Sequence, residues 1–216
     1  MPESKDSEWT WKGYVDRVNN ELIANWGNLT NRVLKMTKRY FGSVVPEPGT
    51  LDERDRVLLE TVDAAFDNVG KLYDGCKFRA AVTEALAIST LVNQYLEMAE
   101  PWATAKTDMN QTAKSLYVAI QAISGLKVLF APVLPFTSQQ VHEMLGEDGT
   151  LFGQAEIKTF AETERSHTAL TYDGTSAVGK WERSEIPVGR QLPKPAALFK
   201  KLDDSVVEDE IGRLGT

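Results

Sequence analysis

Apolar side chains recur every three or four residues along the first two thirds of the chain. In an α-helix this spacing gathers apolar side chains on one face, so the pattern predicts amphipathic helices. The first stripe comprises Trp11, Val15, Val18, Leu22, Trp26, Leu29, Val33, Met36 and Tyr40. Gly42 follows it and ends it, and Pro46 and Pro48 make the next connection rigid. The stripe therefore predicts one long helix over residues 11–40.

Further apolar stripes predict three more long helices and one short helix. Asp52 or Thr50 can cap a second helix, which Gly75 closes. A third helix is expected from about Lys77 until just before Pro101, because the residue preceding a proline disfavours the right-handed helical region. The last two are expected over residues 110–130 and from Thr137 or Ser138 to Leu145. Short connections between these helices predict an all-α fold, an antiparallel helical bundle over residues 11–146.

The apolar stripes weaken on both sides of this bundle. Residues 1–10 read as a leader, whose first eight residues are polar and charged. Residues 147–190 contain glycines and prolines at short intervals, which predicts a mostly irregular appendage with residues 169–181 as the candidates for a hairpin. Residues 191–216 form a C-terminal tail, and residues 205–214 suit a short helix. Trp181 and Phe199 are expected to fold the tail back onto the protein.

The composition is that of an ordinary globular protein, with 42% hydrophobic and 25% charged residues. The net charge of −7 argues against a non-specific nucleic-acid binder. Residues 1–42 nevertheless carry seven Lys and Arg against five Asp and Glu, a local net charge of +2. Any contact with nucleic acid is therefore expected to depend on a few side chains of the first helix.

The single cysteine, Cys76, excludes an intrachain disulfide and indicates a reducing compartment. We expect it to be a small buried apolar residue. No run of apolar residues approaches the roughly 18–20 residues of a membrane span, and no signal-peptide pattern is found at the N-terminus. The expected location is the cytoplasm, away from any membrane.

The first helix also carries a polar ridge. Asn28 and Arg32 are four residues apart and share a helix face, and Lys35 and Arg39 continue the stripe. An amide offers both donors and acceptors, and a guanidinium offers a planar fork suited to phosphate or a base edge. Such a ridge is chemistry for reading nucleotides rather than for filling a core.

The sequence lacks the common motifs of self-contained catalysis. His142 and His167 are the only histidines, and neither has the spacing of a metal-binding motif. No phosphate-binding glycine loop and no Gly-x-Ser-x-Gly nucleophile motif is present. The carboxylates are expected on exposed helix faces. The sequence therefore predicts no catalytic residue, no metal site and no cofactor in this chain.

Several segments, in this order, resemble the C-terminal, anticodon-binding half of methionyl-tRNA synthetases. They are Trp9-Thr10-Trp11, Arg17 to Leu22, Asn25 to Val33, Asn93-Gln94-Tyr95, Pro101-Trp102 with Lys106, Leu129 to Thr137, Leu145-Gly146 and Gly189 to Phe199. The Ala-Pro-x-x-Pro-Phe element within Leu129 to Thr137 is shared with synthetases for other amino acids. Pro101-Trp102 together with Asn28 and Arg32 is what points to methionine.

The resemblance implies a reader of the CAU anticodon. It places Asn28 and Arg32 where the family contacts the anticodon bases, Trp102 where an indole stacks on the wobble base, and Pro101 behind that ring. Single-stranded loops are generally recognised in this way, by stacking on aromatic rings and by hydrogen bonds to base edges. Lys35 and Arg39 are candidates for phosphate contacts or for solvated charges.

The resemblance also implies what lies outside these residues. The partner would be methionine tRNA through its anticodon stem-loop, with no role for DNA. ATP with Mg²⁺, methionine and, as a further candidate, zinc would belong to the family's catalytic half, whose signatures this sequence lacks. The tail over residues 191–216 would dock on that catalytic domain. The chain alone is expected to activate no amino acid.

Plainer readings of the same residues stay open at this point. Asn28 suits a helix–helix hydrogen bond, Arg32 a surface ion pair, and Trp102 a core position. Asn25 and Asn93 are expected to be structural, bonding between helices. Two other functions are an anticodon domain of a sibling class I synthetase, and a helical module that docks a protein through residues 147–216.

Overall fold

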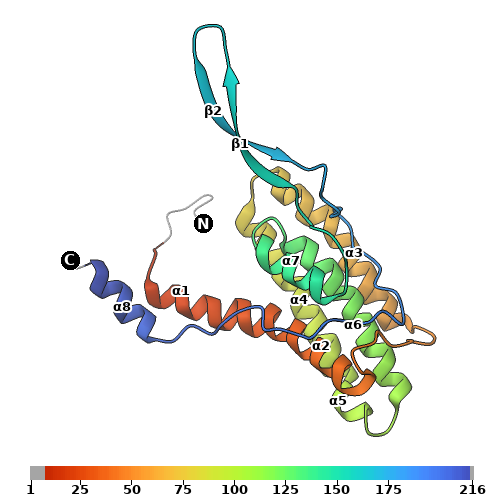
Figure 1. Ribbon diagram of the computed structural model, residues 1–216. Helices are drawn as coiled ribbons and strands as arrows, with labels where there is room; N and C mark the ends of the chain where they lie inside the picture. Colours follow the sequence, from red (N-terminus) through yellow and green to blue (C-terminus); the bar gives the residue numbers. More distant parts are fainter. Residues whose placement is uncertain (1–7, 215–216) are drawn as a thin grey trace.

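The computed structural model describes residues 8–214, and the expectation of a leader over residues 1–10 falls mostly outside them. The first three elements, α1 (Trp11–Arg17), η1 (Val18–Gly27) and α2 (Asn28–Phe41), form one continuous helical segment (Figure 1). Thr10 begins it, because its hydroxyl accepts a hydrogen bond from the backbone N–H of Gly13. Gly42 ends it in a left-handed conformation. The long first helix is thus confirmed.

The middle of this segment, η1, is wound as a π-helix rather than as the α-helix that the stripe predicts. Side chains that leave η1 have partners on three sides. The amide of Asn19 bonds the backbone of Leu202, the amide of Asn25 bonds helix α4, and Trp26 is fully buried. The π-helical winding points each of these side chains toward its own partner. Tertiary contacts therefore override the α-helical geometry that the spacing of apolar residues predicts.

The remaining helices of the bundle follow in antiparallel order. They are α3 (Glu53–Asp74), α4 (Phe78–Ala99), α5 (Pro101–Thr104), α6 (Met109–Phe130) and α7 (Pro135–Met144). Asp52 caps α3 in a reciprocal capping box with Asp55. Helix α7 begins two residues before the earliest predicted start, because Pro135 occupies its first turn, where no backbone donor is needed. The predicted all-α bundle is confirmed.

Helix α6 is the centre of the bundle and packs against α2, α3, α4, α5 and α7 (Figure 1). Every residue from Ile120 to Phe130 is buried. By length and composition α6 is apolar enough to cross a membrane, contrary to the expectation that no such run exists. Nearly nine tenths of its most apolar stretch is buried inside the protein, which is typical of a core helix.

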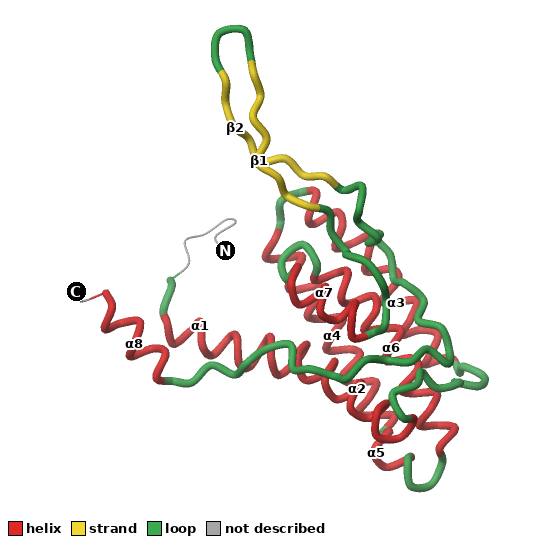
Figure 2. The backbone as a smooth tube through the Cα atoms, in the orientation of Figure 1, coloured by secondary structure: helices red, strands yellow, loops and turns green. Residues whose placement is uncertain are grey.

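Residues 181–202, which we call the strap, cross the bundle in extended form from α3 to η1 (Figure 2). At its start, Trp181 donates from Nε1 to the carbonyl of Phe66 at 2.9 Å. In its middle, the Gln121 amide donates to the carbonyl of Ile186 and accepts from the same residue's N–H. Phe199 packs on Gly27 near its end. The expectation that Trp181 and Phe199 fold the tail back is confirmed, and helix α8 (Ser205–Leu214) follows.

A hairpin of two antiparallel strands, β1 (Gln154–Ala161) and β2 (Ser166–Asp173), projects from one end of the bundle (Figure 1). The predicted position over residues 169–181 was wrong, since only its first residues lie in β2. The chain turns between Glu162 and Arg165, where no glycine marks the turn. The strands escaped prediction because almost every residue in them is exposed, so burial imposes little alternation on the sequence.

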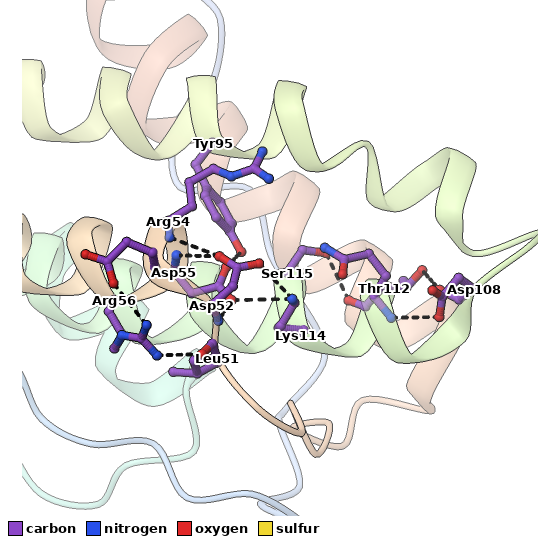
Figure 3. Close-up of polar contacts among 12 residues, drawn as sticks. Leu51, Asp52, Arg54, Asp55, Arg56, Tyr95, Asp108, Thr112, Lys114 and Ser115 are labelled. Atoms are coloured by element: carbon purple, nitrogen blue, oxygen red, sulfur yellow. Dashed lines mark hydrogen bonds and ion pairs between the residues drawn. The ribbon is translucent and has the colours of Figure 1, made fainter.

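A polar network joins the start of α3 to α4 and α6 (Figure 3). The Tyr95 hydroxyl donates to Asp55 at 2.7 Å, and Lys114 lies 2.9 Å from Asp52 and 3.7 Å from Asp55. Asp55 is only 2% exposed, so the expectation of exposed carboxylates is wrong here. Burial and the Asp55 contact raise the pKa of Tyr95 far above its usual value, which keeps the phenol protonated as the donor.

A second buried polar cluster lies between α6, α7 and the strap. The Lys127 ammonium contacts the Glu147 carboxylate, and lies 3.3 Å from His142 Nδ1 and 3.0 Å from the Ser184 hydroxyl. Burial and the positive charge of Arg190 lower the pKa of Lys127 to about 7. Lys127 is 1% exposed, so its charge depends on these partners.

Cys76 corrects another expectation, because it is exposed rather than buried. It lies in the turn between α3 and α4, with a φ of 54°. The turn carries it away from the apolar faces of both helices.

His142 predicts a pH dependence of stability. Burial lowers its pKa below the usual value of about 6.5, opposed by its bond to the Asp148 carbonyl and by Glu143, with Lys127 and Arg190 adding to the lowering. Below pH 6.5 the unfolded chain therefore binds a proton before the native protein does, and stability falls as the pH falls. Urea unfolding at pH 7.5, 6.5 and 5.5 should show a smaller loss for His142→Gln than for the wild type.

The exposed histidine provides the control for this measurement. His167→Gln removes the half-exposed histidine of the hairpin and so controls for the loss of a histidine as such. Equal slopes for wild type and His142→Gln would contradict the assignment.

Candidate nucleic-acid interface

The structure brings Arg32 and Trp102 together from two helices that are far apart in sequence. Glu100 adopts a left-handed conformation at the end of α4, with a φ of 44°, and turns the chain into α5. Buried Pro101 begins α5 and presents Trp102, which is half-buried. The guanidinium of Arg32 lies 5.3 Å from the centre of the Trp102 ring, in cation–π contact. Trp102 is thus a surface aromatic rather than a core residue.

Glu97 belongs to the same cluster and was missed by the sequence reasoning. Its carboxylate lies 2.9 Å from Arg32, and the two side chains are 60% and 37% exposed. Such an exposed ion pair stabilises a protein by about 0–1 kcal/mol. Replacing Glu97 by another hydrogen-bond acceptor for Arg32 therefore requires little free energy. The surface ion pair considered for Arg32 therefore exists, and it leaves the guanidinium available. In the sequence, the one feature that could have pointed to Glu97 is its position one helical turn before the Pro101-Trp102 pair.

Asn28 lies on the same helix as Arg32, one turn earlier, which is about 6 Å along the axis. It is exposed, and within residues 8–214 we find no hydrogen bond to its side-chain amide. A small cavity of about 40 Å³ separates it from the strap at Leu198 and Phe199. Within the described residues, Asn28 thus does not make the helix–helix hydrogen bond that was considered for it.

That structural role falls to Asn25 instead. Its amide donates to Thr90 Oγ1 at 2.9 Å and to the carbonyl of Leu86 at 3.2 Å, and it accepts from Ser89 at 2.8 Å and from Asn93 at 3.0 Å. The expectation that Asn25 and Asn93 bond between helices is confirmed. These bonds fix the turn before Asn28 to α4, whose end carries Glu97.

Helix α5 has its own anchor. The hydroxyls of Thr104 and Thr112 are 2.8 Å apart and join α5 to the start of α6. Lys114, two residues after Thr112, holds α6 to the start of α3 through Asp52 (Figure 3). Trp102 is therefore presented by a rigid corner of the bundle, as a preorganised stacking surface requires.

Lys35 and Arg39 extend the polar face of α2 beyond Arg32. Both are exposed, and Arg39 lies 5.5 Å from the ring centre of its neighbour Tyr40. Among residues 8–214 no carboxylate lies within ion-pair distance of either cation. This face of α2 therefore presents an amide and three cations in line, one of them paired with Glu97.

The groups present in this cluster indicate what it can bind. In the part of the chain that the structure describes, no group of three or more His, Cys, Asp or Glu residues is placed to hold a metal ion. The cluster offers an aromatic face, a guanidinium and an unpaired amide, which are donors and stacking surfaces for an unstacked base.

Comparison with known families gives two matches within the chain. The family described as "Anticodon binding domain of methionyl tRNA ligase" matches residues 45–175, more than half of the chain. The family described as "tRNA synthetases class I (M)" matches residues 1–34. Pro101 and Trp102 lie in the first match, Asn28 and Arg32 in the second, and Lys35 and Arg39 between the two.

Curated relatives agree along the whole chain. Methionine–tRNA ligases of Roseiflexus sp. (strain RS-1) and Thermomicrobium roseum are each 45% identical over 99% of this chain. The chain spans only 36% and 37% of their lengths.

A solved structure has the same fold. The apo form of Mycobacterium tuberculosis methionyl-tRNA synthetase gives a TM-score of 0.73 at 23% identity, over 92% of this chain and 36% of that one. These matches favour methionine over a sibling synthetase. The chain belongs to the family of anticodon-binding domains of methionyl-tRNA ligases.

Proposed function

We propose that this chain reads the CAU anticodon of methionine tRNA, so that the complete ligase can attach methionine in an ATP-dependent reaction in the cytoplasm. The observation that carries the proposal is the cation–π contact of Arg32 with Trp102, with unpaired Asn28 one turn away on α2. Trp102 would stack on the wobble base, with Pro101 supporting its ring. Asn28 and Arg32 would bond the edges of the unstacked anticodon bases.

The ion pair of Arg32 supports a specific exchange on binding. In the free protein Glu97 holds the guanidinium beside the Trp102 ring, so the fork is already oriented. A base edge or phosphate that accepts from Arg32 would replace an exposed carboxylate contact of small energy. Lys35 and Arg39 would add phosphate contacts along α2, which predicts affinity that falls with salt.

The remaining chemistry of the ligase is assigned to the catalytic portion of the complete protein. ATP with Mg²⁺, methionine and zinc would bind there, and no residue of this chain is assigned to them. Residues 191–216, which include α8, would dock on that portion. The chain by itself is proposed to bind the anticodon stem-loop and to catalyse nothing.

The decisive test is binding of the chain to a short stem-loop with CAU, compared with the same stem-loop carrying one changed anticodon base, at fixed salt. Trp102→Ala should weaken CAU binding by about 1–3 kcal/mol, roughly 5- to 150-fold, because one stacked base is lost. Arg32→Ala should do the same through a lost base contact. Both variants should also lose preference for CAU over the changed base.

Trp9→Ala is the matched control, because Trp9 is an exposed tryptophan two residues before α1, and α1 lies far from α5 (Figure 1). It should leave binding unchanged, and circular dichroism should show intact helix in every variant. Equal affinity for all stem-loops would mean that the chain binds RNA through charge alone and does not read the anticodon. No binding by a folded chain would favour a protein-docking module through residues 147–216.

A further inference from the structure

The hairpin β1–β2 is the part of the chain that the proposed function does not use. It stands away from the bundle, on the end opposite α5 (Figures 1 and 2). Ile157 is 76% exposed, Leu170 73% and Tyr172 64%. A two-stranded hairpin is marginally stable in water, and a sheet of three or more strands with an apolar face is the usual stable unit. This hairpin therefore has the properties of half a sheet.

The two faces of the hairpin differ in character. The register pairs Ala155 with Tyr172 and Ile157 with Leu170, so these four side chains lie on one face. On the opposite face of β1 lie Glu156 and Lys158, whose charged groups are 3.3 Å apart. Ile157 is thus an apolar residue flanked in sequence by one negative and one positive charge.

The outer edge of β1 is free, because within residues 8–214 the sheet consists of β1 and β2 alone. The N–H of Glu162 donates to the carbonyl of Arg165 next to the turn, which marks that pair as hydrogen-bonded. Hydrogen-bonded and non-hydrogen-bonded pairs alternate along an antiparallel ladder, so the Ile157–Leu170 pair is of the second kind. The N–H and C=O of Ile157 therefore point outward, to the free edge.

We propose that two copies of this chain associate by antiparallel pairing of their β1 edges about Ile157. In that register Ile157 opposes Ile157 of the second copy, and Ala155 opposes Thr159. Glu156 of each copy then opposes Lys158 of the other, which forms two cross-strand ion pairs on the polar face. The apolar faces join into one strip, and two hairpins become a four-stranded sheet.

The β2 edge is less suited to the same pairing. Centred on Leu170, it would oppose Ala169 to Thr171, so the central residue would have no charged neighbours to fix the register. Its nearest complementary pair would be His167 with Asp173, three residues from the centre, and His167 Nδ1 already lies 3.6 Å from the carboxylate of Glu162 in the same chain. Charge complementarity adjacent to the centre favours β1.

Charge reversal tests both the association and its register. Sedimentation of the 24.0 kDa chain over a concentration series should show a monomer–dimer equilibrium. Glu156→Lys and Lys158→Glu should each weaken the dimer at least about tenfold, because like charges then face each other twice. Mixing the two single variants should restore a dimer, and so should the double variant Glu156→Lys/Lys158→Glu.

Cross-linking locates the edge. In a Cys76→Ser background, Ile157→Cys should form a disulfide-linked dimer under mild oxidation, since directly opposed residues of a hydrogen-bonded pair have Cα atoms about 5.5 Å apart. Leu170→Cys is the matched control on β2 and should not. A monomer at all concentrations, or a dimer unaffected by the charge reversals and linked through Leu170→Cys, would overturn the proposal. None of these substitutions touches the α2–α5 interface, so stem-loop binding tests the proposed function separately.

Discussion

Trp26→Ala should lower the free energy of unfolding by about 3–5 kcal/mol, the cost typical of removing a large aromatic side chain from a core. Trp26 is fully buried in η1 and packs against Phe130 of α6, with ring centres 5.2 Å apart. Its indole nitrogen has no hydrogen-bond partner in the described part of the chain, so the loss is one of packing. Urea unfolding followed by circular dichroism measures the change.

Trp9→Ala again serves as the control, because Trp9 is 64% exposed and the expected change is within about 0.5 kcal/mol. Trp26→Phe should lower the free energy of unfolding by less than half as much as Trp26→Ala, because only the second ring of the indole is removed and the contact with Phe130 is kept. A loss below about 1 kcal/mol for Trp26→Ala would mean that the bundle closes over the cavity.

Lys127→Ala is expected to have an effect of similar size, for an electrostatic reason. Removing the ammonium leaves the Glu147 carboxylate, 12% exposed, without the cation that it contacts. Breaking a buried ion pair in this way costs about 3–5 kcal/mol, whereas replacing both partners by neutral groups is often nearly harmless. The double variant Lys127→Met/Glu147→Gln should therefore recover most of the stability, as measured by urea unfolding at pH 6, below the Lys127 pKa of about 7, where the ammonium is charged.

A matched comparison uses the exposed pair Lys12–Asp16 on α1, where Lys12→Ala should change stability by no more than about 0.5 kcal/mol. If the double variant at the buried pair is as unstable as Lys127→Ala alone, the cluster acts through shape rather than charge.

Helix periodicity predicted the bundle well because each long helix buries one face. The stripes located α3, α4 and α6 to within a residue or two, and Gly42 and Gly75 correctly marked helix ends. The hairpin was misplaced because exposed strands need no alternation of apolar and polar residues. Asp55 was misjudged because its partner, Tyr95, lies forty residues away.

At the candidate interface, too, residue identities were predictable from the sequence, whereas contacts between distant residues were not. Arg32 and Trp102 were selected by residue type and resemblance, and their contact across α2 and α5 became visible only in three dimensions. Glu97 carried too weak a signal, since an acidic residue on an exposed helix face is ordinarily a solvated charge. Asn25 and Asn28 look alike in sequence, and only the fold shows that the first is bonded and the second is unpaired.

The strap has a consequence for biosynthesis. Asn19, near the start of the chain, makes two hydrogen bonds to the backbone of Leu202 across 183 positions: its side-chain N–H donates to the carbonyl, and its side-chain oxygen accepts from the N–H. Val45 likewise bonds Gly189 and Arg190. A ribosome delivers the early helices long before these partners leave the exit tunnel. The bonds of Asn25 to α4 and the packing of Trp26 against Phe130 can therefore form early, whereas the contacts of Asn19 and Val45 with the strap form only after residues 181–202 have been translated.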